Sequence, residues 1–98
     1  MGNDGHTASL FPHSPALDDE DKLVLANTGP MVTPPDRITM TYKLINGSRF
    51  VAIMVTGSGK KGVVKAVARG GPPADLPILG VHPVGGEHRW YLDRAACP

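Results

Sequence analysis

The chain has 98 residues, of which 41% are hydrophobic and 19% charged, and its formal net charge is +1. This length allows a single domain spanning residues 1–98, and the hydrophobic content is too high for a disordered tail. Its small, scattered charge argues against nucleic-acid or membrane binding through bulk electrostatics. A single cysteine excludes an internal disulfide, and no apolar run approaches the ~20 residues of a membrane helix, so we expect a cytoplasmic protein.

The first part of the chain predicts a long loop followed by two short strands. Residues 1–21 lack hydrophobic periodicity and contain several glycines and prolines, which indicates a loop with one short helical turn around 7–11. The apolar segment 22–27 predicts a buried strand that ends at an Asn-Thr-Gly-Pro turn. Segment 37–42 alternates polar and apolar residues, which predicts a second strand or an extended entry into the next element.

The second part of the chain has the pattern of an α/β fold. Segment 43–48 fits either a hairpin turn or one or two turns of helix. Segment 49–57 is apolar on both faces, which predicts a central strand with both sides covered. Valines and alanines in 58–71 line one face of a helix that two glycines end. Residues 76–83 form a short apolar segment interrupted by prolines, and 88–96 predicts a strand and then a helical turn.

The stretch "VTGSGKKG" resembles a phosphate-binding loop, because a strand, glycines and a lysine precede a helix. It departs from the P-loop pattern, since Met54 and Lys61 stand where glycine and Ser or Thr are required. A helix N-terminus still offers free backbone N–H groups and a partial positive charge, to which Lys60 adds its own. From this stretch alone, an anion site at Lys60 and a solvated surface lysine both fit.

Other polar residues carry weaker signals. Arg37 follows a loop at the start of a strand, where binding residues often occur, although a surface arginine fits the same pattern. The histidines at 13, 82 and 88 lack close metal-ligand spacing and no cysteine pair exists, so we expect no metal site. No serine lies in a GxSxG motif, which argues against a serine nucleophile of that type.

The opening stretch "NDGHTAS" is the sharpest local feature. Asp4 and His6 are separated by Gly5 alone, so in extended backbone both side chains point the same way. A carboxylate beside an imidazole can fix the tautomer of the ring, which is the arrangement of a general base that works near pH 7. A plain Asp-Gly-His turn without catalytic function is the alternative.

Four blocks in order extend this signal along the chain: "MGNDGHTASLFP", "PPDRITMT", "VTGSGK" and "GGEHRWYLDRAA". Together they resemble the 6-phosphogluconolactonases, which belong with the glucosamine-6-phosphate isomerases and deaminases. The opening block has the lactonase form "DGHTASLFP", whereas the deaminases have a form similar to "DGHIAFNEP". The deaminase or isomerase activity is therefore the less favoured alternative.

The resemblance implies a Rossmann-like, three-layer α/β fold and a carboxylic ester hydrolase of the pentose phosphate pathway. Its implied substrate is a small sugar-phosphate lactone, 6-phospho-D-glucono-1,5-lactone, which is hydrolysed to 6-phosphogluconate without a metal or organic cofactor. His6 would be the general base that activates water, and Asp4 would be its acidic partner or a second active-site carboxylate. Arg37 and Lys60 would bind the 6-phosphate of the substrate.

The resemblance also has one large departure. Members of the family are considerably longer, and their first half carries further strands and a glycine- and hydroxyl-rich phosphate loop that this sequence does not contain. We therefore expect the C-terminal portion of the fold, incomplete at its N-terminal half. Three hypotheses follow: an active lactonase, an inactive remnant with at most weak sugar-phosphate binding, or one half of a split enzyme that a separate N-terminal chain completes.

Overall fold

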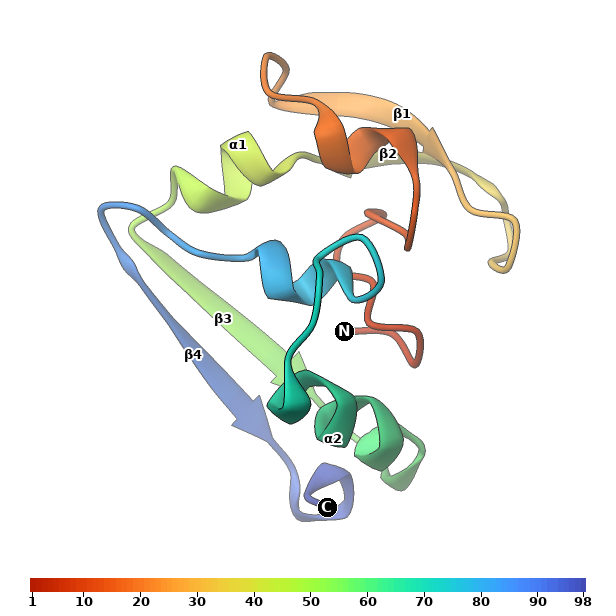
Figure 1. The fold of residues 1–98 in the computed structure, drawn as a ribbon, viewed down its shortest axis with the longest axis vertical. Coiled ribbons are helices and arrows are strands. Elements are labelled where there is room, and N and C mark those ends of the chain that lie inside the picture. Colours follow the sequence, from red (N-terminus) through yellow and green to blue (C-terminus); the bar gives the residue numbers. More distant parts are fainter.

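A computed structural model describes all residues from Met1 to Pro98. Its strands form two separate two-stranded sheets (Figure 1). Strands β1 (Val24–Thr28) and β2 (Asp36–Met40) pair antiparallel, whereas β3 (Phe50–Val55) and β4 (Glu87–Leu92) pair parallel. The helices are α1 (Tyr42–Asn46) and α2 (Lys61–Arg69), with short 3-10 helices η1 (Pro15–Asp18), η2 (Ser58–Lys60), η3 (Pro77–Gly80) and η4 (Arg94–Ala96). Neither α-helix has the length and apolar character to cross a membrane.

The hydrophobic core is assembled around the N-terminal loop. This loop lies in the middle of the molecule, between the β1–β2 hairpin and α2 (Figure 1). Leu10 of the loop is fully buried and belongs to a cluster with residues from η1, α1, β3, η3 and η4 and the residue after η3: Ala16, Ile45, Ile53, Val55, Ile78, Ala96 and Val81. The segment that carries Asp4 and His6 is therefore integrated into the fold rather than frayed from it.

The predictions of a helix within 58–71 and of a strand and helical turn within 88–96 are confirmed. Helix α2 ends at Arg69 before Gly70, and residues 88–96 contain most of β4 followed by η4. The ambiguous segment 43–48 is mostly helical, because Thr41 caps α1 by accepting a hydrogen bond from the backbone N–H of Leu44 at 3.3 Å.

The helical turn predicted around 7–11 is wrong. Residues 7–10 form a tight turn instead, in which the Leu10 N–H donates to the Thr7 carbonyl at 2.9 Å. The helical turn of this region is η1, which begins at Pro15, a residue whose fixed φ favours the first position of a helix.

The prediction of a strand at 22–27 is confirmed as β1, but its predicted burial is wrong. Within β1 only Asn27 is buried, and Val24 is half exposed. The reason is that β1 pairs with β2 alone, so its other edge and much of its surface have no covering element.

Strand β2 buries its polar face. Thr39 is 1% exposed and Ile38 is 78% exposed, so the apolar side of the alternating pattern points outward. The Thr39 hydroxyl faces inward because its Oγ1 accepts a hydrogen bond from the Ser9 N–H at 3.0 Å and donates to the Met40 carbonyl at 2.8 Å. Buried hydroxyls are tolerated when they are paired in this way.

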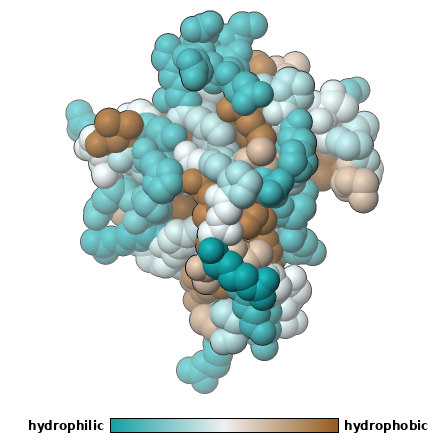
Figure 2. Space-filling model, in the orientation of Figure 1, coloured by the Kyte–Doolittle hydropathy of each residue, from teal (hydrophilic) through white to brown (hydrophobic).

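Strand β3 is confirmed as a strand, whereas the predicted central position is wrong. It pairs with β4 only, and Met54 on its outer face is 68% exposed. Ile53 and Val55 point into the core, so one face of the parallel pair is packed and the other is bare. Apolar side chains consequently reach the surface in several places (Figure 2). Parallel sheets normally have both faces covered, which makes this bare face unusual.

Candidate functional site

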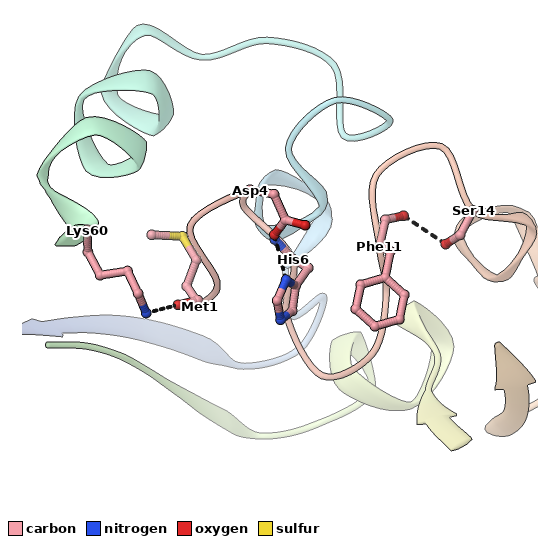
Figure 3. Close-up of polar contacts among 6 residues, drawn as sticks. All are labelled: Met1, Asp4, His6, Phe11, Ser14 and Lys60. Atoms are coloured by element: carbon pink, nitrogen blue, oxygen red, sulfur yellow. Dashed lines mark hydrogen bonds and ion pairs between the residues drawn. The ribbon is translucent and has the colours of Figure 1, made fainter. Parts of the chain in front are cut away.

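Asp4 and His6, the predicted catalytic pair, lie in direct contact (Figure 3). The distance between His6 Nδ1 and Asp4 Oδ1 is 2.5 Å, and the same oxygen accepts a hydrogen bond from the His6 backbone N–H at 3.0 Å. The turn between them requires Gly5, whose φ of +85° lies in the region that glycine adopts most readily. The two side chains therefore meet through a closed Asp-Gly-His turn and not along extended backbone, and their catalytic role stays a prediction.

The imidazole of His6 is held on its other sides by Gly2 and Phe11. A Cβ at Gly2 would overlap the ring, and the Gly2 N–H donates to the His6 carbonyl at 2.9 Å. The Phe11 ring meets the imidazole edge-on, with the centroids 5.1 Å apart. The side chain remains 25% exposed. We assign the ring proton to Nδ1, which faces the carboxylate, so that the Nε2 lone pair is the one available as a base.

A hollow of about 200 Å³ opens beside the Asp4 carboxylate. It lies between the N-terminal loop and the β1–β2 connection and is lined by Asp4, Phe11, Pro12, Gly29, Pro30 and Met31. Asp4 is the only charged residue in this lining, and His6 is not part of it.

Lys60, a predicted phosphate ligand, reaches the same loop. It is the last residue of η2, directly before α2, and its Nζ donates to the Met1 carbonyl at 2.6 Å (Figure 3). Burial, and then the charge of Lys60, lower the pKa of the Met1 amino group below its usual value. A positive side chain therefore lies against the segment that leads directly into Gly2 and the Asp4–His6 turn.

Arg37, the other predicted phosphate ligand, is not brought to this turn. Its Nε donates to the Pro34 carbonyl at 2.6 Å and its Nη2 to the Thr33 carbonyl at 3.3 Å. It also lines an open hollow together with Asp19 and Asp36, whose carboxylates oppose an anion. A phosphate-binding role for Arg37 stays a prediction.

Sequence reasoning missed the residues that surround the Asp4–His6 pair. Gly2 and Phe11 both contact the His6 ring, yet neither belongs to a pattern with a chemical meaning of its own. Their role follows from the folding of residues 1–11 back on themselves, for which the glycines at 2 and 5 were the only local signal.

All of these residues lie within a segment that matches a known protein family. The family described as "Glucosamine-6-phosphate isomerases/6-phosphogluconolactonase" matches residues 1–90. The chain belongs to this family. The resemblance that the four sequence blocks predicted is thereby confirmed.

Relatives within the family carry lactonase names. The chain is 43% identical to "Probable 6-phosphogluconolactonase 1" of Oryza sativa subsp. japonica, over 98% of this chain and 34% of the relative. It is 38% identical to the 6-phosphogluconolactonase of Bos taurus, again over 98% of this chain but 37% of the relative. The chain thus spans little more than a third of the length of these relatives.

Solved structures of the family have the same fold over this region. The structure titled "6-phosphogluconolactonase from Trypanosoma cruzi" superposes with a TM-score of 0.80 at 28% identity, covering 98% of this chain and 37% of that chain. The 6-phosphogluconolactonase from Leishmania guyanensis gives a TM-score of 0.78 at 31% identity, covering 98% and 38%. The predicted α/β fold of the lactonase type is confirmed as a partial fold.

Proposed function

We propose that this chain carries the catalytic turn of a 6-phosphogluconolactonase, which hydrolyses 6-phospho-D-glucono-1,5-lactone to 6-phosphogluconate. The observation that carries the proposal is the 2.5 Å contact between His6 Nδ1 and Asp4 Oδ1, which leaves Nε2 as the basic nitrogen. The lactonase names of the relatives support the same reaction. The form of the opening block favours lactone hydrolysis over the deamination of an amino-sugar phosphate.

The proposed chemistry is general-base catalysis. Nε2 of His6 takes a proton from a water molecule as its oxygen bonds to the lactone carbonyl carbon. The Asp4 carboxylate holds the ring in place and stabilises the imidazolium that forms. Collapse of the tetrahedral intermediate breaks the bond to the ring oxygen, which receives the proton back from His6. Help of this kind contributes about 10²- to 10⁴-fold to the rate.

The proposed phosphate ligands are Lys60 and Arg37. Each donates to a backbone carbonyl in this structure, so binding the substrate phosphate requires an exchange of partners. The exchange is favourable for Lys60, because a bond to a charged oxygen is stronger than one to a neutral carbonyl. Lys60 is the last residue of η2, and Arg37 is the second residue of β2, directly after the loop whose carbonyls accept its hydrogen bonds.

The bare face of the β3–β4 sheet fits an inactive remnant. It also favours a second candidate function, in which this chain is one half of a split enzyme. The exposed outer face of β3, where Met54 lies, fits the absence of a covering layer. In this alternative a separate polypeptide, corresponding to the part of the family domain that this chain does not span, covers that face before the site becomes active.

The deciding experiment follows the loss of 6-phospho-D-glucono-1,5-lactone relative to its spontaneous hydrolysis. The purified chain is compared with His6→Ala, and with His13→Ala as a control histidine that lies outside the turn. We expect accelerated hydrolysis by the wild type and the control only. Equal rates for the wild type and His6→Ala would refute catalysis by this chain alone. Adding the remaining portion of the rice relative tests the split enzyme, and no gain on mixing would remove that alternative.

A further inference from the structure

The turn that carries Asp4 and His6 rests on the 3-10 helix η3. The Ile78 N–H donates to the Gly5 carbonyl at 2.9 Å, and Leu76 packs so closely against Gly5 that a Cβ there would overlap its side chain. Ile78 itself is 2% exposed and belongs to the core. Because Gly5 is the residue between Asp4 and His6, the position of η3 sets the position of both side chains.

Helix α1 holds η3 from the opposite side through two polar side chains. The Tyr42 hydroxyl donates to the Pro77 carbonyl at 2.5 Å. The Asn46 side chain makes two bonds, with Nδ2 donating to the Gly80 carbonyl at 2.9 Å and Oδ1 accepting from the His82 N–H at 2.8 Å. Residues four apart lie on the same face of a helix, so the two side chains act from one surface of α1.

The contact between α1 and η3 is also close in its packing. A Cβ at Gly80 would overlap the phenol ring of Tyr42, so the segment lies directly against the ring. Burial raises the pKa of Tyr42 to about 12, so its hydroxyl remains a donor at any working pH. Three backbone groups of residues 77–82 are thus fixed by two side chains.

We propose that Tyr42 and Asn46 are positioning residues for His6, acting through η3 and Gly5. The proposal rests on the proposed role of His6 as the general base, and it adds two residues whose side chains bond η3 and His82 instead of the Asp4–His6 turn. Small displacements matter in such a system, because a shift of about 1 Å at a reacting group can cost ~10²-fold in rate. The hydrogen bonds from α1 to Pro77 and Gly80 remove the freedom that would permit this shift.

The test uses Tyr42→Phe and Asn46→Asp in the full chain. Tyr42→Phe removes one hydroxyl, and Asn46→Asp removes the donor to Gly80 while keeping an acceptor for His82. Two readouts are measured by NMR: hydrogen exchange of the Ile78 amide, and the ¹⁵N shifts of the His6 ring, which report its tautomer. We expect the Ile78 amide to exchange about threefold to tenfold faster, because that factor corresponds to the net contribution of one hydrogen bond to stability. We also expect the His6 ring nitrogens to move toward a mixture of tautomers.

Matched controls separate positioning from general destabilisation. Tyr91→Phe removes the hydroxyl of a tyrosine on β4 that makes no side-chain hydrogen bond, and Ser48→Ala removes a bond to the Leu44 carbonyl just beyond α1, away from η3. Both controls should leave the Ile78 exchange and the His6 shifts as in the wild type. Unchanged Ile78 exchange and His6 shifts in both test variants would overturn the proposal, as would equal changes in the controls.

The two readouts do not depend on lactonase activity. A chain that fails to hydrolyse the lactone can still show the predicted coupling, so failure of the proposed function is distinguishable from failure of this inference. Should one variant not fold, the other decides, because each cuts a different bond between α1 and η3.

Discussion

Replacing Thr39 by valine tests the inverted burial of β2. The Thr39 hydroxyl accepts from the Ser9 N–H at 3.0 Å, and the Ser9 carbonyl in turn accepts from Asn27 Nδ2 at 2.8 Å. This short network joins the β1–β2 hairpin to the loop that continues from His6. Thr39→Val substitutes a methyl group of similar volume for the hydroxyl, so it removes the partner of a buried amide without leaving a cavity.

The expected magnitude follows from burial. Thr39 is 1% exposed and Ser9 is 8% exposed, so water cannot replace the lost acceptor. Leaving one buried donor unpaired costs about 1–3 kcal/mol in the free energy of unfolding. In a chain of this size, 1 kcal/mol corresponds to roughly 4–8 °C in Tm, which predicts a decrease of about 4–24 °C.

The assay is urea and thermal unfolding followed by circular dichroism, with Thr56→Val as the control. Thr56 is exposed and makes no side-chain hydrogen bond, so its replacement should change the free energy of unfolding by less than about 0.5 kcal/mol. A Thr39→Val protein as stable as that control would refute the reasoning, because it would mean that the Ser9 amide does not depend on the hydroxyl.

Three further predictions address the catalytic turn, the helix contact and the bare sheet. Asp4→Asn keeps an oxygen for the two His6 donors but loses the charge, so kcat for lactone hydrolysis should fall about tenfold, the difference between a charge-assisted and a neutral hydrogen bond; an unchanged kcat contradicts it. Since burial raises the pKa of Tyr42 from 10.0 to about 12, stability present below pH 10 should be lost as the pH rises toward 12. Tyr42→Phe should weaken that alkaline loss in unfolding measured across this range, whereas superimposable profiles speak against it. Met54→Lys places a charge on the exposed face of β3, and sedimentation velocity should show less self-association than in the wild type; equal association refutes an adhesive role for this face.

Local patterns predicted the elements that depend on local interactions. The spacing of valines in 61–69 and the glycine at 70 are sufficient for α2, because helix formation and termination use residues within one or two turns. The contact between Asp4 and His6 was predictable for the same reason, since one glycine separates them and both atoms of the bond belong to one turn.

Local patterns do not determine burial where a distant partner decides it. The inward orientation of Thr39 depends on Ser9, which lies 30 residues earlier in the chain. Likewise the apolar sequence of β3 indicates a strand covered on both faces, yet the element that would cover Met54 is not among residues 1–98. A pattern of apolar residues indicates that a strand needs covering surfaces, but it does not show whether those surfaces are present.

The two predicted phosphate ligands differ in how well the structure supports them. Lys60 reaches across 59 residues of sequence to the Met1 carbonyl, which puts its charge on the segment that enters the Asp4–His6 turn. Arg37 is fixed by carbonyls of the loop that precedes β2 and shares its hollow with Asp19 and Asp36. An anion arriving at Lys60 replaces one neutral acceptor by a charged one, whereas an anion arriving at Arg37 must also overcome two carboxylates. Lys60 is therefore the cation that we expect to bind the substrate phosphate first.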